Sequence, residues 1–251
     1  MALIGGESGE ELFYWVLKNI LLGPLVKLIW RPWVEGLENV PTDGPVILAP
    51  NHCSFMDSLF MPMMLPRRVV FLGKADYFDK WYVSWFFKGV GVIPVRREGG
   101  EAGEASLKAG TEQLRKGLAV AIYPEGTRSP DGRLYRGKTG VARMAVRAGV
   151  PVIPIGIIGS YDVQPHNKKM PRVRGIRVGV RFGRPLDFSR YEGKEDDRFV
   201  LRSITDEVMY ELMLLTGQEY VDEYAAKVKD QIKKAAKSPL DRPSEPLVKA
   251  G

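Results

Sequence analysis

The chain of 251 residues carries 37 Lys and Arg against 30 Asp and Glu, a net charge of +7. Its length and its apolar fraction of 45% allow a sizeable hydrophobic core that needs no cross-links. The single cysteine, Cys53, excludes an internal disulfide. The positive charge suits nucleic acid, an anionic membrane or a phosphorylated substrate, and composition does not choose among them.

The N-terminal segment is apolar and aromatic. The first residues are acidic where an export signal would be basic, and no small-residue cleavage site follows, so we expect no export. The run from Leu12 to Trp33 contains three cationic residues and a central Gly23-Pro24, which predicts two short amphipathic helices hinged at that dipeptide. We interpret residues 1–33 as a membrane-associating segment that docks at the headgroup boundary; packing of the helix pair on the core is the alternative.

Short apolar strands alternate with helical patterns after this segment. Strands are expected at 46–49, 69–72, 90–95, 119–123, 152–158 and 176–182. Helices are expected at 58–65, 81–87, 104–116 and 139–148, followed by 197–216 and 220–236, which should pack back on the sheet. This alternation predicts a single α/β domain over residues 34–237, with a mixed, mostly parallel sheet covered by helices. The proline-rich, charged end at 238–251 is typical of a disordered tail.

A histidine and an aspartate follow the first predicted strand of the sheet. His52 would leave the carboxyl edge of the sheet, where α/β proteins bind ligands, and imidazole suits proton transfer near neutrality. On one regular helix, His52 and Asp57 would point about 140° apart and would not meet, but they can meet across a strand-to-helix junction. There the carboxylate can hold the Nδ1 proton and leave Nε2 as a base. The alternative is that both residues merely cap their elements.

Two other chemistries for this stretch are weaker. Cys53 could be a nucleophile, but side chains of adjacent residues usually point apart, which separates it from His52. One His and Asp pair does not make a coordination shell, so the sequence predicts no metal site.

Residues suited to binding a phosphate gather at the ends of three predicted strands. The turn after 119–123 offers a glycine that permits close approach, a hydroxyl and an arginine fork, although any surface loop has a similar composition. Two other strands end in cationic residues, so several positive charges should converge on one edge. The substrate-binding candidates are Lys74, Arg97, Glu125, Gly126, Thr127 and Arg128. Glu125 would orient Arg128 or hold a substrate hydroxyl.

Further basic residues crowd the second half of the chain, namely Arg133, Arg136, Lys138, Arg143, Arg147, Lys168, Lys169, Arg172, Arg174, Arg177, Arg181 and Arg184. Most should be solvated surface. A subset facing a bilayer, or the phosphates of a thioester donor, would contribute about 1 kcal/mol each near anionic lipid. No nucleic-acid fingerprint or stacking pattern accompanies them, so we expect no nucleic-acid partner.

The blocks NHCSFMD at 51–57 and PEGTR at 124–128 resemble those of the glycerolipid acyltransferases typified by 1-acyl-glycerol-3-phosphate acyltransferase, which carry His-x-x-x-x-Asp and Glu-Gly-Thr-Arg. Two weaker blocks, GVIPVRR at 91–97 and VPVIPI at 150–155, follow in the family's order. The resemblance covers residues 34–187 and is specific, because four ordered blocks rarely agree by accident. Arg96 departs from the acidic or amide residue that many members have there, which bears on the acceptor headgroup.

The resemblance implies transfer of a fatty acyl group from acyl-CoA or acyl-ACP to the hydroxyl of a lysophospholipid, giving phosphatidic acid. His52 would be the base and Asp57 its partner, while Arg97 and the segment 125–128 would bind the acceptor phosphate. Such a dyad can activate an alcohol for direct attack on a thioester, so we expect no metal or other cofactor. Backbone N–H groups near the helix after His52 are our hypothesis for the oxyanion donors.

Two alternatives stay open at this point. The same chemistry could act on glycerol phosphate, another lysolipid or a glycolipid, because the motifs are shared. Less favoured is a non-catalytic, basic membrane-binding protein in which His52 is a structural cap. The preferred interpretation places the protein on the cytoplasmic face of the cell membrane, as a peripheral or monotopic enzyme.

Overall fold

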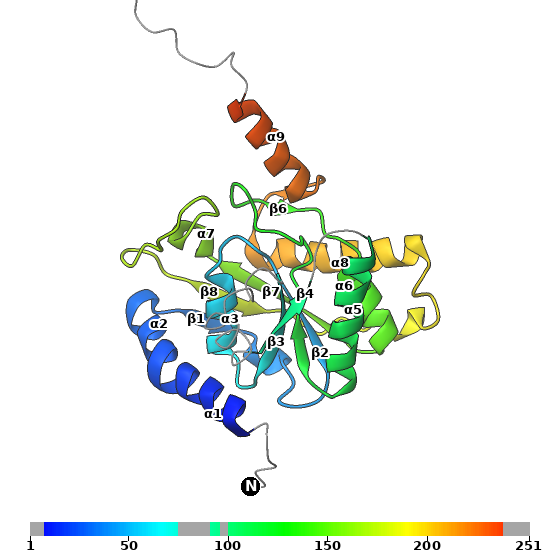
Figure 1. The fold of residues 1–251 in the computed structure, drawn as a ribbon, viewed down its shortest axis with the longest axis horizontal. Helices are drawn as coiled ribbons and strands as arrows, with labels where there is room; N and C mark the ends of the chain where they lie inside the picture. Colours follow the sequence, from blue (N-terminus) through cyan, green and yellow to red (C-terminus); the bar gives the residue numbers. More distant parts are fainter. Residues whose placement is uncertain (1–7, 75–90, 96–99, 238–251) are drawn as a thin grey trace, which may run out of the picture.

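The computed structural model describes residues 8–74, 91–95 and 100–237 (Figure 1). The helix expected at 81–87 and the tail expected at 238–251 lie outside these residues.

A seven-stranded sheet forms the centre of the described chain (Figure 1). Its order is β1-β8-β7-β2-β5-β3-β4, and the strands are β1 (Trp33–Glu35), β2 (Val46–Pro50), β3 (Val69–Lys74), β4 (Val92–Val95), β5 (Ala119–Ala121), β7 (Val152–Ile158) and β8 (Gly179–Phe182). β8 pairs antiparallel with β7 and parallel with β1, while the other pairs are parallel. A separate parallel pair joins β6 (Leu134–Tyr135) to β9 (Tyr220–Val221). The mixed, mostly parallel sheet of one α/β domain is therefore confirmed.

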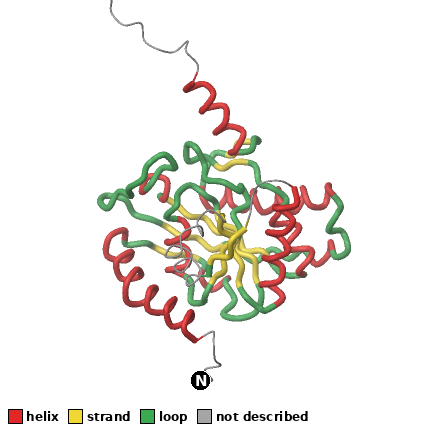
Figure 2. Tube along the Cα trace, in the orientation of Figure 1, coloured by secondary structure: helices red, strands yellow, loops and turns green. Residues whose placement is uncertain are grey.

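Helices cover both faces of the sheet (Figure 2). The covering helices are α3 (Asp57–Met64), α5 (Gly100–Arg115), α6 (Gly140–Ala148) and α8 (Arg198–Thr216). The described chain also contains the short α7 (Ser160–Val163), α9 (Ala225–Lys237) and 3-10 turns at Leu37–Asn39 and Ser189–Tyr191. The two sides of β2 show how the core divides: Val46 and Leu48 pack in the cluster with α3, whereas Ile47 and Ala49 pack in the cluster with α6 and α8. Alternate residues of one strand thus supply both cores, which is why it reads as a continuous apolar run.

The C-terminal part differs from the sequence expectation. α8 packs against β7 as predicted, but Tyr220–Val221 forms β9 and the helix starts only at Ala225. α9 leaves the body of the domain, so the prediction that it packs on the sheet is wrong (Figure 1). The sequence of α9 explains the difference, because AAKVKDQIKKAAK is rich in lysine and offers few apolar residues beyond the buried Ala225.

The N-terminal segment is one helical run and does not hinge at Gly23-Pro24. α1 (Ser8–Val16) passes through a π-helical turn at Leu17–Leu22 into α2 (Gly23–Trp30). Pro24 has no N–H to donate and its ring crowds the preceding turn, and a π turn before it relieves that crowding without breaking the helix. A Cβ on Gly23 would lie 1.9 Å from the carbonyl oxygen of Lys18, so this turn requires glycine.

One side of this helical run packs against the domain, and the other side is exposed. Trp30 is buried and meets Phe60 of α3 edge to face at 5.4 Å between ring centroids, and the Lys18 ammonium donates to the carbonyl of Leu65. On the outer side, Leu12 and Leu28 are 63% and 73% exposed. By length and composition, Glu11–Trp30 is long and apolar enough to cross a membrane.

Candidate active site

The loops that follow β2 and β5 are bonded to each other through the backbone of His52. The N–H of His52 donates to Oε1 of Glu125 at 2.9 Å, and its carbonyl oxygen accepts from the N–H of Ser129 at 2.6 Å. Because both strands are parallel neighbours, their carboxyl ends meet at one edge. The two motifs found in the sequence therefore form one unit.

His52 and Asp57 meet across the junction between β2 and α3. Nδ1 of His52 lies 3.0 Å from Oδ2 of Asp57, the fully buried first residue of α3. The same Oδ2 accepts from the backbone N–H groups of Cys53 at 2.8 Å and Ser54 at 2.7 Å. A carboxylate oxygen held by these N–H groups can only accept from the imidazole, which favours the proton on Nδ1 and leaves Nε2 able to take one.

Four of the backbone N–H groups after His52 make hydrogen bonds within this loop. Those of Cys53 and Ser54 serve Asp57, and that of Met56 donates to Oγ of Ser54. The N–H of Asp57 faces the carbonyl oxygen of Ser54 at 3.4 Å. These four N–H groups hold the loop around Asp57 and are therefore poor oxyanion donors, and the oxyanion hypothesis stays a prediction for the other N–H groups near α3.

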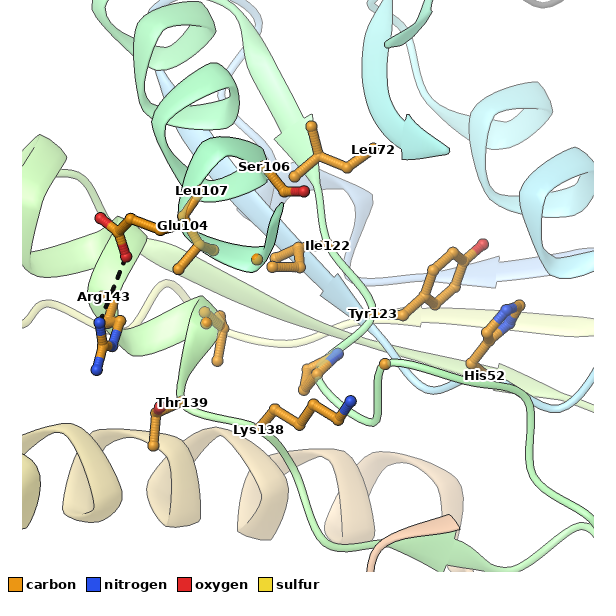
Figure 3. Close-up of a pocket in the computed structure, with 15 residues that line it drawn as sticks. His52, Leu72, Glu104, Ser106, Leu107, Ile122, Tyr123, Lys138, Thr139 and Arg143 are labelled. Atoms are coloured by element: carbon orange, nitrogen blue, oxygen red, sulfur yellow. Dashed lines mark hydrogen bonds and ion pairs between the residues drawn. The ribbon is translucent and has the colours of Figure 1, made fainter. Parts of the chain in front are cut away.

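Tyr123 was not singled out from the sequence. Its ring lies beside the imidazole of His52 (Figure 3), stacked with centroids 3.7 Å apart and planes inclined by 16°. Its hydroxyl lies 2.8 Å from Oγ of Ser58. The stack limits rotation of the imidazole, and the Ser58 contact fixes the phenol. The signal in the sequence was the position of Tyr123, two residues before Glu125 at the end of a strand.

Asn51 and Gln218 hold the base of the same loop. The Asn51 side chain accepts from the N–H of Ile157 at 2.7 Å, donates to the carbonyl of Ile157 at 3.1 Å, and donates to Gln218 Oε1 at 2.9 Å. Gln218 also donates to Sγ of Cys53 at 3.2 Å. Burial raises the pKa of the Cys53 thiol well above its ordinary value, which opposes the thiolate that a nucleophile needs.

Glu125 is buried and bonded to backbone. Its Oε1 accepts from His52 and its Oε2 from the N–H of Tyr135 at 3.0 Å. Burial raises its pKa to about 8 against these two hydrogen bonds. Both oxygens are engaged, so the geometry favours a positioning role over the contact with Arg128 or a substrate hydroxyl that we expected from the sequence.

The rest of the turn is surrounded by cationic groups. Thr127 Oγ1 accepts from Lys229 Nζ of α9 at 3.1 Å, and the Lys138 side chain lies over Gly126, whose φ is +70°. Burial and then the nearby Arg128 lower the pKa of Lys229 to about 8. Among the residues that the structure describes, no carboxylate lies within ion-pair distance of the half-buried Arg128. The positive charges around this turn favour binding of an anion. Lys229 is a residue of this site that sequence reasoning missed.

A cavity of about 420 Å³ opens beside His52 (Figure 3). One end carries His52 and Tyr123, and the other carries the ion pair of Arg143 with Glu104. Its walls between these ends are mostly apolar, from Leu72, Leu107, Ile122 and Val141.

Two of the candidates lie outside this description. The side chain of Lys74 is not among the described atoms, although its backbone ends β3, and Arg97 falls in the undescribed segment 96–99. In the described part of the chain, His, Cys, Asp and Glu side chains form no group of three or more that could hold a metal ion.

A parallel α/β domain with a His-Asp pair at a strand end and cations beside it agrees with comparisons to known proteins. The acyltransferase family profile matches residues 31–158. The chain belongs to the acyltransferase family.

Its relatives are glycerolipid enzymes. The chloroplastic 1-acyl-sn-glycerol-3-phosphate acyltransferase of Arabidopsis thaliana is 37% identical over 133 residues, 53% of this chain and 37% of that protein. The 1-acyl-sn-glycerol-3-phosphate acyltransferase of Bacillus subtilis is 29% identical over 167 residues, 64% of this chain and 78% of that protein. The crystal structure of the 1-acyl-sn-glycerophosphate (LPA) acyltransferase of Thermotoga maritima shares the fold, with a TM-score of 0.63, 24% identity and 84% of each chain covered. The matched region thus spans well under half of the plant protein.

Proposed function

We propose that this protein transfers a fatty acyl group from acyl-CoA or acyl-ACP to the free hydroxyl of 1-acyl-glycerol-3-phosphate, giving phosphatidic acid. The observation that carries the proposal is the His52 and Asp57 pair, with Nδ1 and Oδ2 3.0 Å apart, held against the turn that presents Arg128. The curated relatives named above carry this activity in their names, which supports the same acceptor here.

His52 is the general base in this proposal. Nε2 takes the proton of the acceptor hydroxyl while its oxygen forms a bond to the thioester carbonyl carbon, and Asp57 stabilises the imidazolium. The tetrahedral intermediate then expels the thiolate by breaking the carbon–sulfur bond, and the imidazolium returns the proton to sulfur. The products are an ester and a free thiol, no acyl-enzyme forms, and no metal is needed. A base in this role contributes a rate factor of about 10² to 10⁴.

The acceptor phosphate binds at the turn 125–128. Arg128 supplies the fork that matches a phosphate, Thr127 contributes its hydroxyl, and Gly126 allows the backbone to approach. We include Lys74 and Arg97 as further ligands from the neighbouring strands. The apolar walls of the cavity beside His52 suit an acyl chain with its thioester near Nε2.

The N-terminal segment, residues 1–33, docks the acyltransferase domain, residues 34–237, on the cytoplasmic face of the cell membrane. Exposed leucines at Leu12 and Leu28, on a helix that is also fixed to the core, support a monotopic or peripheral arrangement. Replacing both by glutamate leaves the buried face intact and should reduce vesicle binding. Unchanged sedimentation with vesicles would contradict docking by this segment.

The deciding experiment measures thiol release from long-chain acyl-CoA with lysophosphatidic acid, glycerol 3-phosphate or a neutral lysolipid, using wild type beside His52→Ala. Turnover with lysophosphatidic acid that is lost in His52→Ala supports the proposal. Turnover with another acceptor alone would keep the chemistry and replace the substrate. Equal turnover by His52→Ala would refute the assignment of His52 as the general base. No turnover with either acyl-CoA or acyl-ACP would leave the alternative of a non-catalytic membrane protein.

A further inference from the structure

A strongly basic loop, residues 164–178, connects α7 to β8. Between Asp162 and Asp187 the chain has no acidic residue and seven cationic ones. Of these, Arg181 is already paired with Glu35 at 2.7 Å. The basic loop itself carries Lys168, Lys169, Arg172, Arg174 and Arg177, all exposed. So dense a cluster of one sign attracts anions.

The same loop exposes apolar side chains. Met170 is 79% exposed and Val173 is 52% exposed, each within two residues of cationic neighbours on either side. A soluble polyanion would not use these apolar groups. Apolar tips among lysines and arginines match the boundary of an anionic bilayer, where apolar groups enter the headgroup layer and cations face the lipid phosphates.

The basic loop is held in place by hydrogen bonds. The buried Gln164 side chain donates to the carbonyl of Lys169 at 2.9 Å, and the N–H of Arg172 donates to the carbonyl of Val163 at 2.8 Å. These bonds fix the turn whose tip presents Met170. The exposure is therefore built into the fold.

The basic loop also joins the apolar N-terminal helix to the active-site edge. The indole Nε1 of Trp30, the last residue of α2, donates to the carbonyl of Arg172 at 2.9 Å. At the other end of the loop, burial and then the charges of Lys229 and Arg128 lower the pKa of His166, which also bonds to the backbone of Pro130. Figure 1 shows the loop after α7 on the same side of the domain as α2. The surface thus runs from the helix to the phosphate-binding turn.

We infer that the basic loop is a second membrane contact, in which Met170 and Val173 enter the headgroup layer of an anionic bilayer and the surrounding cations bind its phosphates. The inference rests on the proposed docking of the N-terminal segment, with which the loop is continuous. Two contacts fix the orientation of the domain, so the turn at 125–128 faces the lipid that supplies the acceptor.

The test is vesicle binding by the full chain without substrate, on phosphatidylcholine alone and with added phosphatidylglycerol. Met170→Asp with Val173→Asp should weaken binding about tenfold on both, and Lys168→Gln with Lys169→Gln should weaken it only on anionic vesicles. The controls are Phe199→Asp, because Phe199 is 88% exposed at the start of α8, and Lys194→Gln. Binding equal to wild type, or the same loss in the controls, would overturn the inference.

A second measurement does not depend on the folding of the double variant. In Met170→Cys, a polarity-sensitive dye will label the new thiol because Cys53 is only 3% exposed. Its emission should shift to the blue on anionic vesicles, and an unchanged spectrum would contradict insertion. Turnover of a short-chain, monomeric lysophosphatidate should persist in the loop variants. A raised KM for acyl-CoA with normal vesicle binding would assign the loop to the thioester donor instead.

Discussion

The imidazole of His52 lies flat against the phenol ring of Tyr123, with centroids 3.7 Å apart. The stack and the bond to Asp57 restrain different motions, since the bond fixes the direction of Nδ1 and the stack fixes the plane of the ring. A general base needs both, because Nε2 must point at the hydroxyl it deprotonates.

Tyr123→Leu should therefore lower kcat about tenfold, while the KM values change little. Tyr123→Phe keeps the ring and removes the hydroxyl that contacts Ser58, so it should stay close to wild type. Steady-state kinetics with both substrates provide the measurement. An equal loss in Tyr123→Phe would assign the effect to the phenol hydroxyl in place of the stack.

Asp57→Asn should lower kcat strongly with little change of geometry. A single oxygen of Asp57 accepts all three described hydrogen bonds, and its Oδ1 has no partner among the described residues, so an amide oxygen can take the same place. What is lost is the negative charge that stabilises the imidazolium. We expect kcat to fall by a factor on the order of 10² to 10⁴. The unfolding free energy should drop by about 1–3 kcal/mol, for one buried N–H₂ without a partner. A near-normal kcat would remove Asp57 from the mechanism.

Glu125 should make the stability of the fold depend on pH. Burial raises its pKa from 4.5 to about 8, so between these values the folded protein binds a proton that the unfolded chain has lost. The contribution of this group is therefore fully present below pH 4.5 and is lost as the pH rises through about 8. Glu125→Gln has no such titration and should cost about 1–3 kcal/mol, because its N–H₂ would face a backbone N–H. Denaturant unfolding between about pH 5 and pH 7.5 should show that the unfolding free energies of wild type and Glu125→Gln converge as the pH rises. Parallel curves would contradict a protonated Glu125.

Lys229 should contribute to binding the acceptor phosphate, because its ammonium contacts Thr127 and lies near Arg128. Lys229→Met should raise the KM for lysophosphatidic acid about tenfold and leave the KM for the thioester unchanged. Lys227→Met is the matched control, since Lys227 lies on the same helix but pairs with Glu223 at 2.9 Å. The same change in both variants would point to α9 as a whole.

Gly23→Ala should disturb the N-terminal helix. The new Cβ would lie 1.9 Å from the carbonyl oxygen of Lys18, and backbone at that distance must move. Since α2 packs on the core through Trp30, we expect a lower melting temperature together with weaker vesicle binding. Gly9→Ala is the control, because a Cβ there meets nothing within 4 Å. Equal melting temperatures for both variants would contradict the π turn.

The sequence predicted the sheet because its signals are local. Continuous apolar runs such as Val152–Ile158 are strands buried on both faces, and that strand has the expected bounds. The contact of His52 with Asp57 was also predictable, because the pattern places a strand before His52 and a helix at Asp57, and such a junction can bring residues at this spacing together. These predictions needed no knowledge of distant contacts.

Other features depend on which segments meet in space. The bond of Glu125 to His52, the stack of Tyr123 on His52 and the approach of Lys229 to Thr127 all join positions far apart in the chain. Likewise, the strand at Tyr220–Val221 exists only because β6 offers it a partner. The secondary-structure propensities of short segments do not predict such pairings.

Asn51, at the start of the active-site loop, is hydrogen-bonded to the sheet. Its side chain accepts from the backbone N–H of Ile157 and donates to the carbonyl oxygen of Ile157. Releasing this clamp requires β2 and β7 to separate, and central strands open only when the whole domain opens. The pair of His52 and Asp57 should therefore not be lost by local unfolding before the whole domain unfolds. Amide protons around Asn51 and Ile157 should exchange with solvent as slowly as the most protected ones in the domain, and heat inactivation should coincide with global melting.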